Sequence, residues 1–512
     1  MKREGLLRHL RRHGCVLRRE GKEHSLWENP QTGHAEAVPR HAEISNLLAK
    51  RISRKLSIPD PPGYNALATE PALTPCTRPR IDLVWLLMTD RRTFIQTAAA
   101  SLALRTAARG RAAAPPSDRI QVGFIGLGGQ GTGRLNEFMS QPDVDAVALC
   151  DLDRTHLDRA AGLVEKQQGR KPETFHDFRK LLERRDLDAA MIATPDHWHA
   201  LPVILACQAG KDVFIEKPLA YSVGEGRAMV NAALKYKRIT QMGNHIHNDL
   251  PTYRRVVEVV RSGVLGKINR VDCSLKTGNK SIGKPTDSAP PAELDYDFWL
   301  GPAPKRPYNS NRSHFNYRYF WDYSGGYLID FWCHYTDVVY WALDLKAPKS
   351  VAATGGRWAV DDNGETPDTI EVLCEYPNLI LTWTLHPNGR PGFDQMGSSV
   401  IFQGSNATLV TNYNRYEVYV NGNREEGFRP PAPTIPDSPG HIREFLDSIK
   451  SRQRTTCDIE YGNRLTKGGL LGNIAYRTGE RLHWDDDRER FAGNTEANRY
   501  VTRRYRKPWK LN

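Results

Sequence analysis

Three glycines at positions 126, 128 and 131 directly follow an apolar run, residues 120–125. In a strand–turn–helix unit this spacing suits a pyrophosphate. The first glycine makes the tight turn, the second lets the backbone approach the phosphates, and the third lets the helix pack against the strand. The N–H groups that open the helix then face the phosphates. Gly126, Gly128 and Gly131 are therefore predicted to bind a dinucleotide.

A second apolar run ends at Asp151, 20 residues after Gly131. At that distance a carboxylate meets the ribose hydroxyls of a bound dinucleotide. Because a carboxylate repels the 2′-phosphate of NADP, Asp151 favours NAD. Arg154 lies close by and keeps NADP as an alternative.

Polar residues follow the next two apolar runs, and ligands bind at the carboxyl ends of parallel strands. They are Thr194, Pro195, Asp196, His197 and His199 after the first run, and Glu216, Lys217 and Pro218 after the second. His197 and His199 have no third ligand nearby, so we expect them to line the cofactor or substrate site and predict no metal. Farther along, Asp330 and His334 are four residues apart and would share one face of a helix.

The elements that must position these residues form an α/β pattern. Apolar runs at 120–125, 144–150, 189–193 and 212–215 alternate with amphipathic stretches, which predicts a doubly wound parallel (Rossmann) sheet over residues 115–240. Residues 241–512 begin with a helix and continue with Thr- and Val-rich runs. They predict an α+β domain with a large, mostly antiparallel open sheet. The strand runs are expected at 351–359, 369–375, 379–385, 399–403, 408–411 and 416–420.

Together these motifs resemble the Gfo/Idh/MocA oxidoreductases from about residue 120 to the C-terminus. The resemblance rests on the glycine turn, on Glu-Lys-Pro at 216–218, on Gly-Gly-x3-Asp-x3-His at 325–334, on Asp-Phe-Trp-Leu-Gly-Pro at 297–302 and on the closing residues 496–509. It implies an enzyme that uses NAD, with NADP as the alternative, to transfer hydride to or from a hydroxyl-bearing carbon of a sugar, sugar derivative or cyclitol.

The resemblance also implies the roles of individual residues. His334 would act as general base toward the substrate hydroxyl, a role that suits a pKa near neutrality. Lys217 would stabilise the developing alkoxide, with its bond to Pro218 cis, and Asp330 would bind substrate or orient the histidine. Cofactor contacts are expected from Thr194, Pro195, His199, Glu216 and Lys217, besides the glycines and Asp151.

Three other residues near these motifs can be interpreted either as ligand contacts or as residues without a role in the site. His245 and His247 lie in a stretch that lines the sugar site in this family, and they are either substrate contacts or surface polar residues. Asp337 is either a structural carboxylate of the helix or a ligand contact. Members of the family often use the open face of the sheet as a subunit interface, so a homo-oligomer is expected.

Residues 1–60 form a separate small α+β unit in this interpretation. Gly21–Trp27, with His24, and Val38–His41 resemble the HicA-like (YcfA-type) mRNA interferase toxins, which have a fold like double-stranded-RNA-binding domains. The resemblance implies RNA as a partner and His24 as the catalytic residue. Glu23 departs from the small residue usual at its position and puts RNA cleavage in doubt. Most of the net charge of +13 lies before residue 119, and a basic front suits phosphate contacts or a solvated surface equally.

Residues 61–87 are Pro-rich and are predicted to be a linker. Residues 88–114 contain paired arginines, a weakly apolar run and Ala-Ala-Ala, typical of a twin-arginine export signal. If translation starts at Met88, the enzyme would be exported to the periplasm; if the full-length fusion is real, it would stay in the cytoplasm. No apolar run is long enough to span a bilayer, and the eight cysteines, without metal spacing, are expected to be free thiols.

Export affects the expected chemistry, because free nicotinamide cofactor is scarce outside the cytoplasm. An exported enzyme would hold its cofactor tightly and recycle it in place. Paired oxidation and reduction of two sugars would do this. NAD-dependent glycoside cleavage, in which hydride leaves and returns, is the alternative, and the motifs do not separate the two.

Overall fold

The computed structural model describes residues 3–20, 24–39, 46–59, 119–277, 280–387 and 397–511. The chain divides into two compact units, residues 1–112 and 113–512. The linker predicted at 61–87 and the signal predicted at 88–114 lie outside the described residues. In the described part, no helix is both long and apolar enough to cross a membrane.

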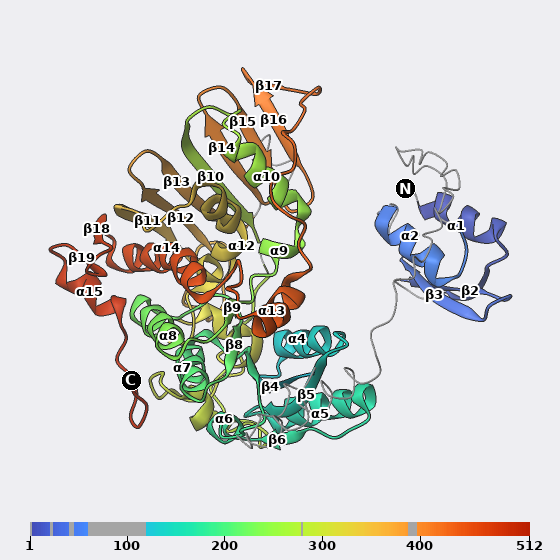
Figure 1. Cartoon of the computed structure of the whole chain (residues 1–512), viewed down its shortest axis with the longest axis horizontal. Helices are drawn as coiled ribbons and strands as arrows, with labels where there is room; N and C mark the ends of the chain where they lie inside the picture. Colours follow the sequence, from blue (N-terminus) through green and yellow to red (C-terminus); the bar gives the residue numbers. More distant parts are fainter. Residues whose placement is uncertain are drawn as a thin grey trace, which may run out of the picture. The chain divides into compact units, whose positions relative to one another are not determined.

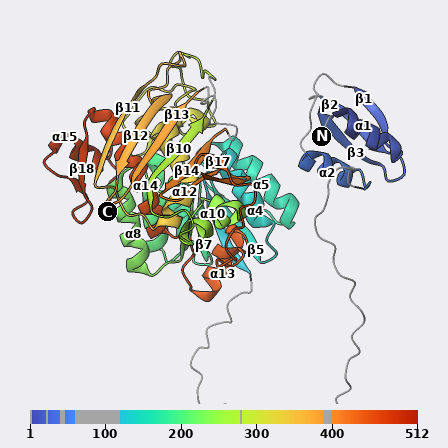
Figure 2. The ribbon, with the colours of Figure 1, turned by 90° about the horizontal axis from the view of Figure 1, so that it is seen from above.

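The N-terminal unit is a three-stranded antiparallel sheet with a helix before it and a helix after it (Figure 2). Its elements are α1 (Arg3–Arg12), β1 (Val16–Glu20), β2 (His24–Asn29), β3 (His34–Pro39) and α2 (Asn46–Lys55). Leu6 and Leu10 of α1 and Ile52 of α2 are buried with Trp27 of the sheet. The predicted small α+β unit is confirmed. Strand β3 is weakly marked in the sequence, because five of its six residues lack the β-branched or aromatic side chains typical of strands.

The second unit begins with a Rossmann domain whose six strands are all parallel, in the order β6-β5-β4-β7-β8-β9. Its strands are β4 (Ile120–Ile125), β5 (Val144–Cys150), β6 (Glu173–Phe175), β7 (Ala189–Ile192), β8 (Asp212–Ile215) and β9 (Thr240–Met242). The four strands expected from the apolar runs are confirmed. Every residue of β5, β7 and β8 is buried, as both faces of a parallel sheet require.

Helices cover both faces of this sheet (Figure 1). One face packs against α4 (Gly129–Met139), α5 (Arg154–Gln168) and α13 (His441–Ser451). The other packs against α6 (Phe178–Leu182), α7 (Ala200–Gln208) and α8 (Val223–Tyr236). Phe445 of α13 contacts both Phe138 and Phe214, so a segment from the far end of the chain completes the Rossmann core.

The C-terminal domain is built on a ten-stranded sheet in the order β17-β16-β15-β14-β10-β13-β12-β11-β18-β19. Its strands are β10 (Ile268–Lys276), β11 (Ser350–Gly356), β12 (Thr369–Glu375), β13 (Ile380–His386), β14 (Ser399–Gly404), β15 (Thr408–Thr411), β16 (Tyr416–Val420), β17 (Asn423–Arg424), β18 (Leu482–Asp485) and β19 (Arg490–Phe491). Among these strands only β10 and β13 pair in parallel, so the predicted mostly antiparallel sheet is confirmed.

One face of this sheet is covered by long helices, and burial alternates along β12 as a one-sided sheet requires. The helices of the domain are α9 (Ile246–Asp249), α10 (Pro251–Arg261), α11 (Tyr296–Leu300), α12 (Gly326–Leu343), α14 (Ile459–Thr478) and α15 (Thr495–Val501). Trp332 of α12 packs on Trp383 of β13 and donates a hydrogen bond to the Leu465 carbonyl of α14. These contacts fix α12, which carries Asp330 and His334.

Candidate functional site

The glycine turn has the geometry that dinucleotide binding requires. Gly126 has a φ of +84°, and a Cβ there would lie 2.7 Å from the backbone of Ala193. At Gly131 a Cβ would lie 1.9 Å from the Gly126 carbonyl oxygen, so the helix can approach the strand only without a side chain. Beside Gly128 the nearest atom to an added Cβ is 3.9 Å away, on His156. The backbone at Gly128 is therefore open to a ligand.

Asp151 stands at the end of β5, where the sequence placed it. Its carboxylate accepts hydrogen bonds from the backbone N–H groups of Leu127 (2.5 Å) and Asp153 (2.8 Å). Burial raises the pKa of Asp151, and these two N–H groups oppose that rise. Asp153 in turn caps α5 by accepting from the N–H of Thr155 at 2.8 Å.

A cavity of about 480 Å³ opens above the turn. Gly126, Gly128, Gly131, Asp151, Thr194 and Pro195 line it from the Rossmann domain, and Leu294, Trp299, His314, Tyr317 and Arg318 line it from the C-terminal domain. The Thr194 hydroxyl is buried and has no hydrogen-bond partner among the described residues. Open backbone at Gly128, a carboxylate at Asp151 and a free buried hydroxyl are what a dinucleotide needs, and the cavity fits one.

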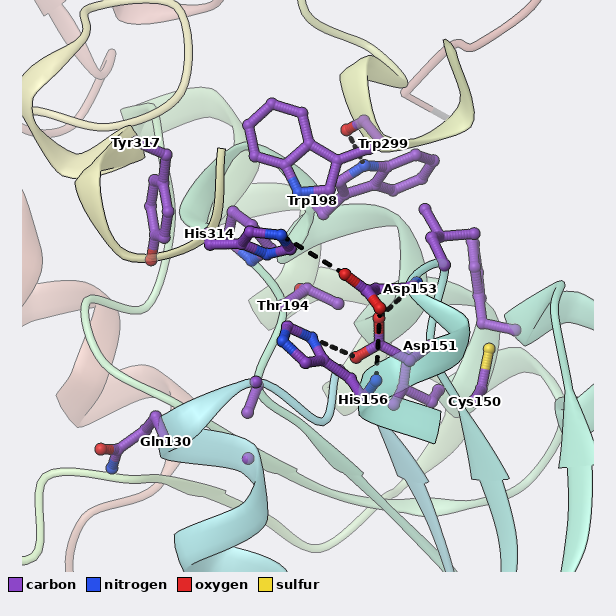
Figure 3. Close-up of a pocket in the computed structure, with 18 of the residues that line it drawn as sticks. Gln130, Cys150, Asp151, Asp153, His156, Thr194, Trp198, Trp299, His314 and Tyr317 are labelled. Atoms are coloured by element: carbon purple, nitrogen blue, oxygen red, sulfur yellow. Dashed lines mark hydrogen bonds and ion pairs between the residues drawn. The ribbon is translucent and has the colours of Figure 1, made fainter. Parts of the chain in front are cut away.

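Segments of the C-terminal domain close over the Asp151 end of this cavity. The Asp295 N–H donates to the Leu152 carbonyl (3.1 Å) and the Arg154 N–H to the Glu293 carbonyl (3.0 Å), on either side of a bridge between Asp153 and Leu294. Beyond this bridge the roof is aromatic, since Trp198 and Trp299 lie over the cavity (Figure 3). The cavity is therefore walled by both domains.

Three side chains at this end have the types that bind metals. Asp153, His156 and His314 bring one ligand atom each to within 4.8 Å of one another. His314 Nε2 lies 3.4 Å from Asp153 Oδ2, and His156 Nδ1 lies 3.8 Å from Asp151 Oδ2 (Figure 3). These groups flank the carboxylate that would meet the cofactor ribose, so they form one wall of the nucleotide cavity.

Lys217 and Asp330 come together from the two domains. Lys217 Nζ lies 2.6 Å from Asp330 Oδ1 and also donates to the Asp330 carbonyl at 3.1 Å. Arg318 Nε lies 3.5 Å from the same carboxylate oxygen. Burial acts to raise the pKa of Asp330, but the charges of Lys217 and Arg318 hold it well below its ordinary value. Asp330 is therefore ionised and holds Lys217 in place; the Lys217–Pro218 bond is cis.

His334 lies one turn after Asp330 on α12. Its Nδ1 is buried and has no hydrogen-bond partner among the described residues. Burial and the Lys217 charge lower its pKa well below 6.5, whereas the sequence interpretation expected a value near neutrality. The ring is therefore neutral at pH 7 and can accept a proton.

Glu216 and His199, predicted as cofactor contacts, face protein groups instead of the cavity. Glu216 is buried and ion-paired to Arg134 of α4 at 2.6 Å. His199 places its ring nitrogens against the carbonyl oxygens of Thr194 (2.9 Å) and Pro218 (2.8 Å). Both residues therefore hold in place the loops that line the cavity and the loop that carries Lys217. A direct contact of either residue with the cofactor stays a prediction.

The remaining histidines divide between structure and site. His197 is buried against the Trp299 carbonyl, and burial lowers its pKa to about 3. His197 and His199 thus make separate backbone contacts. His247 Nδ1 lies 3.1 Å from Asp337, a buried pair that favours the structural interpretation of both residues.

His245 lies close to α12, with its ring 6.2 Å from that of His334. The predicted RNase residue His24 opens β2, and its side chain lies outside the described residues. Arg318 was missed by sequence reasoning, although it lies only seven residues before the Gly-Gly motif at 325–326. His314 was missed too, because nothing local marks a residue 163 positions after Asp151 as its neighbour.

Comparison with known proteins agrees with this geometry. Residues 120–244 match the Gfo/Idh/MocA family described as "Oxidoreductase family, NAD-binding Rossmann fold". Residues 251–369 and 397–511 match its "Oxidoreductase family, C-terminal alpha/beta domain". Over residues 120–511 the chain belongs to the Gfo/Idh/MocA oxidoreductase family, and its first domain is an NAD-binding Rossmann domain.

Individual relatives match a shorter part of the chain. The chain is similar to a glycosyl hydrolase family 109 protein of Shewanella woodyi, 35% identical over 158 residues, which is 30% of this chain and 34% of that protein. The match therefore spans about a third of that relative's length.

Solved structures share the fold. One is the WlbA dehydrogenase from Bordetella pertussis in complex with NADH and UDP-GlcNAcA, with a TM-score of 0.54 and 20% identity, covering 72% of this chain and 99% of that one. Another is scyllo-inositol dehydrogenase from Lactobacillus casei with NAD(H) and scyllo-inositol, with a TM-score of 0.52 and 20% identity, covering 71% and 99%.

Proposed function

We propose that residues 115–512 form an enzyme that transfers hydride between NAD and a hydroxyl-bearing carbon of a sugar, sugar derivative or cyclitol. The observation that carries the proposal is the group Lys217, Asp330 and His334 beside a cavity that fits a dinucleotide. The named ligands of the structural neighbours, a sugar nucleotide and a cyclitol, support this substrate class.

In this mechanism each side chain has one task. When bound, NAD supplies the hydride acceptor. The unpartnered Nδ1 of His334 accepts the proton of the substrate hydroxyl, since the ring is neutral. Lys217, held by Asp330, places positive charge next to the oxygen that loses this proton. Arg318 borders both the cavity and Asp330, and we assign it to positioning the substrate beside them.

We infer NAD in preference to NADP. Asp151 supports this, because its carboxylate lines the cavity and would repel a 2′-phosphate. Arg154, the residue that kept NADP open, is exposed and is not among the described residues that line the cavity. The roof formed by the C-terminal domain supports tight retention of the cofactor, because release requires contacts such as Asp153–His314 to open.

A second activity, NAD-dependent glycoside cleavage, is favoured by the similarity to glycosyl hydrolase family 109. Transient oxidation would need the same His334 and Lys217, so the two activities differ in what happens to the oxidised sugar. The test uses purified residues 115–512, analysed for dinucleotide after gel filtration. Sugars and cyclitols are then assayed by nicotinamide absorbance, alongside chromogenic glycosides.

For the leading proposal we expect retained dinucleotide and an absorbance change with at least one sugar or cyclitol. Chromophore release without an absorbance change would replace it with the glycosidase. Complete loss of cofactor on dilution would contradict tight retention.

For the N-terminal unit we propose RNA cleavage, supported by its helix–three strands–helix order, which suits a double-stranded-RNA-binding-like domain. Residues 1–63 should degrade RNA, and His24→Ala should abolish the activity. Degradation that survives this change would remove the proposed mechanism.

A further inference from the structure

A second cavity, of about 240 Å³, lies where the Rossmann and C-terminal domains meet, away from the glycine turn. Segments that are distant in sequence build it: Tyr221–Val223, which follows the Lys217–Pro218 loop and leads into α8 of the Rossmann domain; Pro304; Trp321–Gly325, which leads into α12; and helices α14 and α15 with the residues after them. None of its lining residues is shared with the nucleotide cavity.

This cavity is strongly cationic. Among the described residues, four arginines line it against a single carboxylate, Asp322, which is ion-paired to Arg306 at 2.9 Å. The arginines are Arg477, Arg499, Arg503 and Arg504. Arg503 pairs with Glu225 at 2.9 Å and Arg499 lies 3.4 Å from Glu496. In the described ranges no carboxylate pairs with Arg477 or Arg504, so two positive charges at the cavity are not neutralised.

The arginines are also held in place. The Arg477 guanidinium lies over the rings of Trp321 (5.0 Å) and Tyr500 (4.2 Å), and Arg503 lies over Tyr221 at 4.4 Å. Stacking on aromatic rings orients a guanidinium while leaving its in-plane N–H groups free to donate. The cations are therefore arranged before any anion arrives.

Two buried polar atoms of the lining have no partner within the described part of the chain: Asn473 Oδ1 and Arg503 Nη1. Asn473 is 6% exposed, and its Nδ2 donates to the Gly325 carbonyl at 3.0 Å. That hydrogen bond fixes which way the amide points, so the unpartnered atom is the oxygen. Buried polar atoms in proteins are nearly always satisfied. The lining thus offers one acceptor, Asn473 Oδ1, and several donors.

We propose that this cavity binds a small hydroxylated anion, such as a sugar acid or a sugar phosphate. The carboxylate or phosphate would lie between Arg477, Arg503 and Arg504, as charge-assisted hydrogen bonds favour. A hydroxyl of the same molecule would donate to Asn473 Oδ1. Because Asn473 also holds Gly325, at the start of the helix that carries Asp330 and His334, the ligand is linked to the catalytic helix through one side chain.

The test is calorimetric titration of the full-length chain with NAD in excess, so that the nucleotide cavity is filled. Gluconate and glucose 6-phosphate are the probes, and glucose and sulfate are the controls. We expect at least one probe to bind, sulfate to bind at least about tenfold more weakly, and any binding of glucose at the catalytic site to be the same in the wild type and in the arginine variants described next. The stronger of the two probes identifies the anion as carboxylate or phosphate.

Variants locate the binding. Arg477→Gln and Arg504→Gln change exposed side chains and should weaken probe binding about tenfold each, while leaving NAD retention unchanged. Asn473→Asp, which puts a negative charge next to the ligand, should abolish binding. Arg488→Gln, on an exposed arginine outside the cavity, is the matched control and should have no effect.

Three results would overturn the proposal. The first is that neither probe binds. The second is that sulfate binds as well as both probes, which means an adventitious ion only. The third is that probe binding is unchanged in Arg477→Gln and Arg504→Gln, which places the anion elsewhere. Since each readout is binding, the proposal stands or falls independently of the reaction catalysed at Lys217 and His334.

Discussion

At the scale of single residues, the contact between Lys217 and Asp330 determines which group can move a proton. The Asp330 carboxylate is ionised and already bound to Lys217, so it is not free to take a proton from the substrate. His334 lies one turn away; its ring is neutral, and its Nδ1 has no hydrogen-bond partner in the described part of the chain. In the proposed mechanism the base is therefore the imidazole, and the two charged groups shape its surroundings.

Removing the side chain of His334 or of Lys217 should lower turnover strongly while leaving the cofactor bound. His334→Ala and Lys217→Ala are each expected to lower kcat by about 10²-fold or more, because general base and oxyanion stabilisation contribute effects of that size. The measurements are turnover on the best substrate and dinucleotide content after gel filtration. Unchanged turnover in either variant would contradict the roles assigned here.

The pH dependence follows from the lowered pKa of His334. The base works only when neutral, so activity should fall as pH falls through the pKa of His334. Because that pKa lies well below 6.5, kcat/KM should stay level from about pH 8 down to about pH 6 and fall only in more acidic solution.

Asp330→Asn removes a negative charge that raises the pKa of His334. In this variant the fall of kcat/KM in acidic solution should therefore occur at still lower pH. A profile of kcat/KM from pH 4.5 to 8.5 checks both statements. If the wild-type activity fell with a midpoint at or above pH 6.5, the lowered pKa of His334 would be contradicted. If the midpoint moved to higher pH in Asp330→Asn, the effect assigned to the Asp330 charge would be contradicted.

Motifs in the sequence identified Lys217, Asp330 and His334 because each lies in a local pattern. The partners of these residues could not be found in the same way. Arg134 and Glu216 form an ion pair although they are 82 residues apart, and only the parallel sheet brings α4 next to the end of β8. Arg318 reaches Asp330 for a similar reason, since the segment before α12 folds back along the helix.

At the scale of elements, buried strands were predictable and short or irregular ones were not. Continuous apolar runs gave β4, β5 and β8 with their observed bounds. Strand β10 was missed, because its sequence INRVDCSLK mixes charged and apolar residues. It lies in the middle of the sheet, where Asp272 is satisfied by Thr382 and Gln403 on the neighbouring strands. The sequence of a single strand does not show which residues on neighbouring strands will bind its polar side chains.

The glycine turn allows a paired test in one helix. A Cβ at Gly131 would overlap the Gly126 carbonyl oxygen, whereas a Cβ at Gly133, two residues on, meets nothing within 4 Å. Gly131→Ala should destabilise the protein by about 2–3 kcal/mol and abolish NAD retention. Gly133→Ala should stabilise it by about 0.5–1 kcal/mol, because alanine suits a helix better than glycine.

Urea unfolding and dinucleotide content measure both effects. Equal behaviour of the two variants would show that α4 does not need close packing on the turn.

At the scale of the whole molecule, one face of the ten-stranded sheet is not covered by any helix among the described residues. Leu373 of β12 and Ile380 of β13 are 42% and 39% exposed there, beside Thr382, which pairs with Leu373 in the register. We propose that this face joins two copies of the chain. Residues 115–512 should then elute as a dimer or higher oligomer, and Leu373→Asp should shift the equilibrium to monomer.

Light scattering after gel filtration measures the mass directly. Leu234→Asp is the matched control, since Leu234 is 55% exposed on α8 of the Rossmann domain and should tolerate the charge. A wild-type monomer, or equal dissociation in both variants, would contradict the interface.

We propose that translation from Met88 yields an exported protein cleaved near Ala114, loaded with the NAD that its two-domain cavity encloses. The twin-arginine route carries folded proteins, so the cofactor would cross the membrane with the enzyme. Expressed with its natural upstream sequence, the periplasmic fraction should contain dinucleotide-loaded protein whose N-terminal peptide begins close to residue 115. Replacing Arg91 and Arg92 together by lysine should keep it in the cytoplasm, whereas the same change at Arg105 and Arg109 should not. Full-length protein confined to the cytoplasm would instead support a genuine fusion with the N-terminal unit, because the signal would then lie inside the chain.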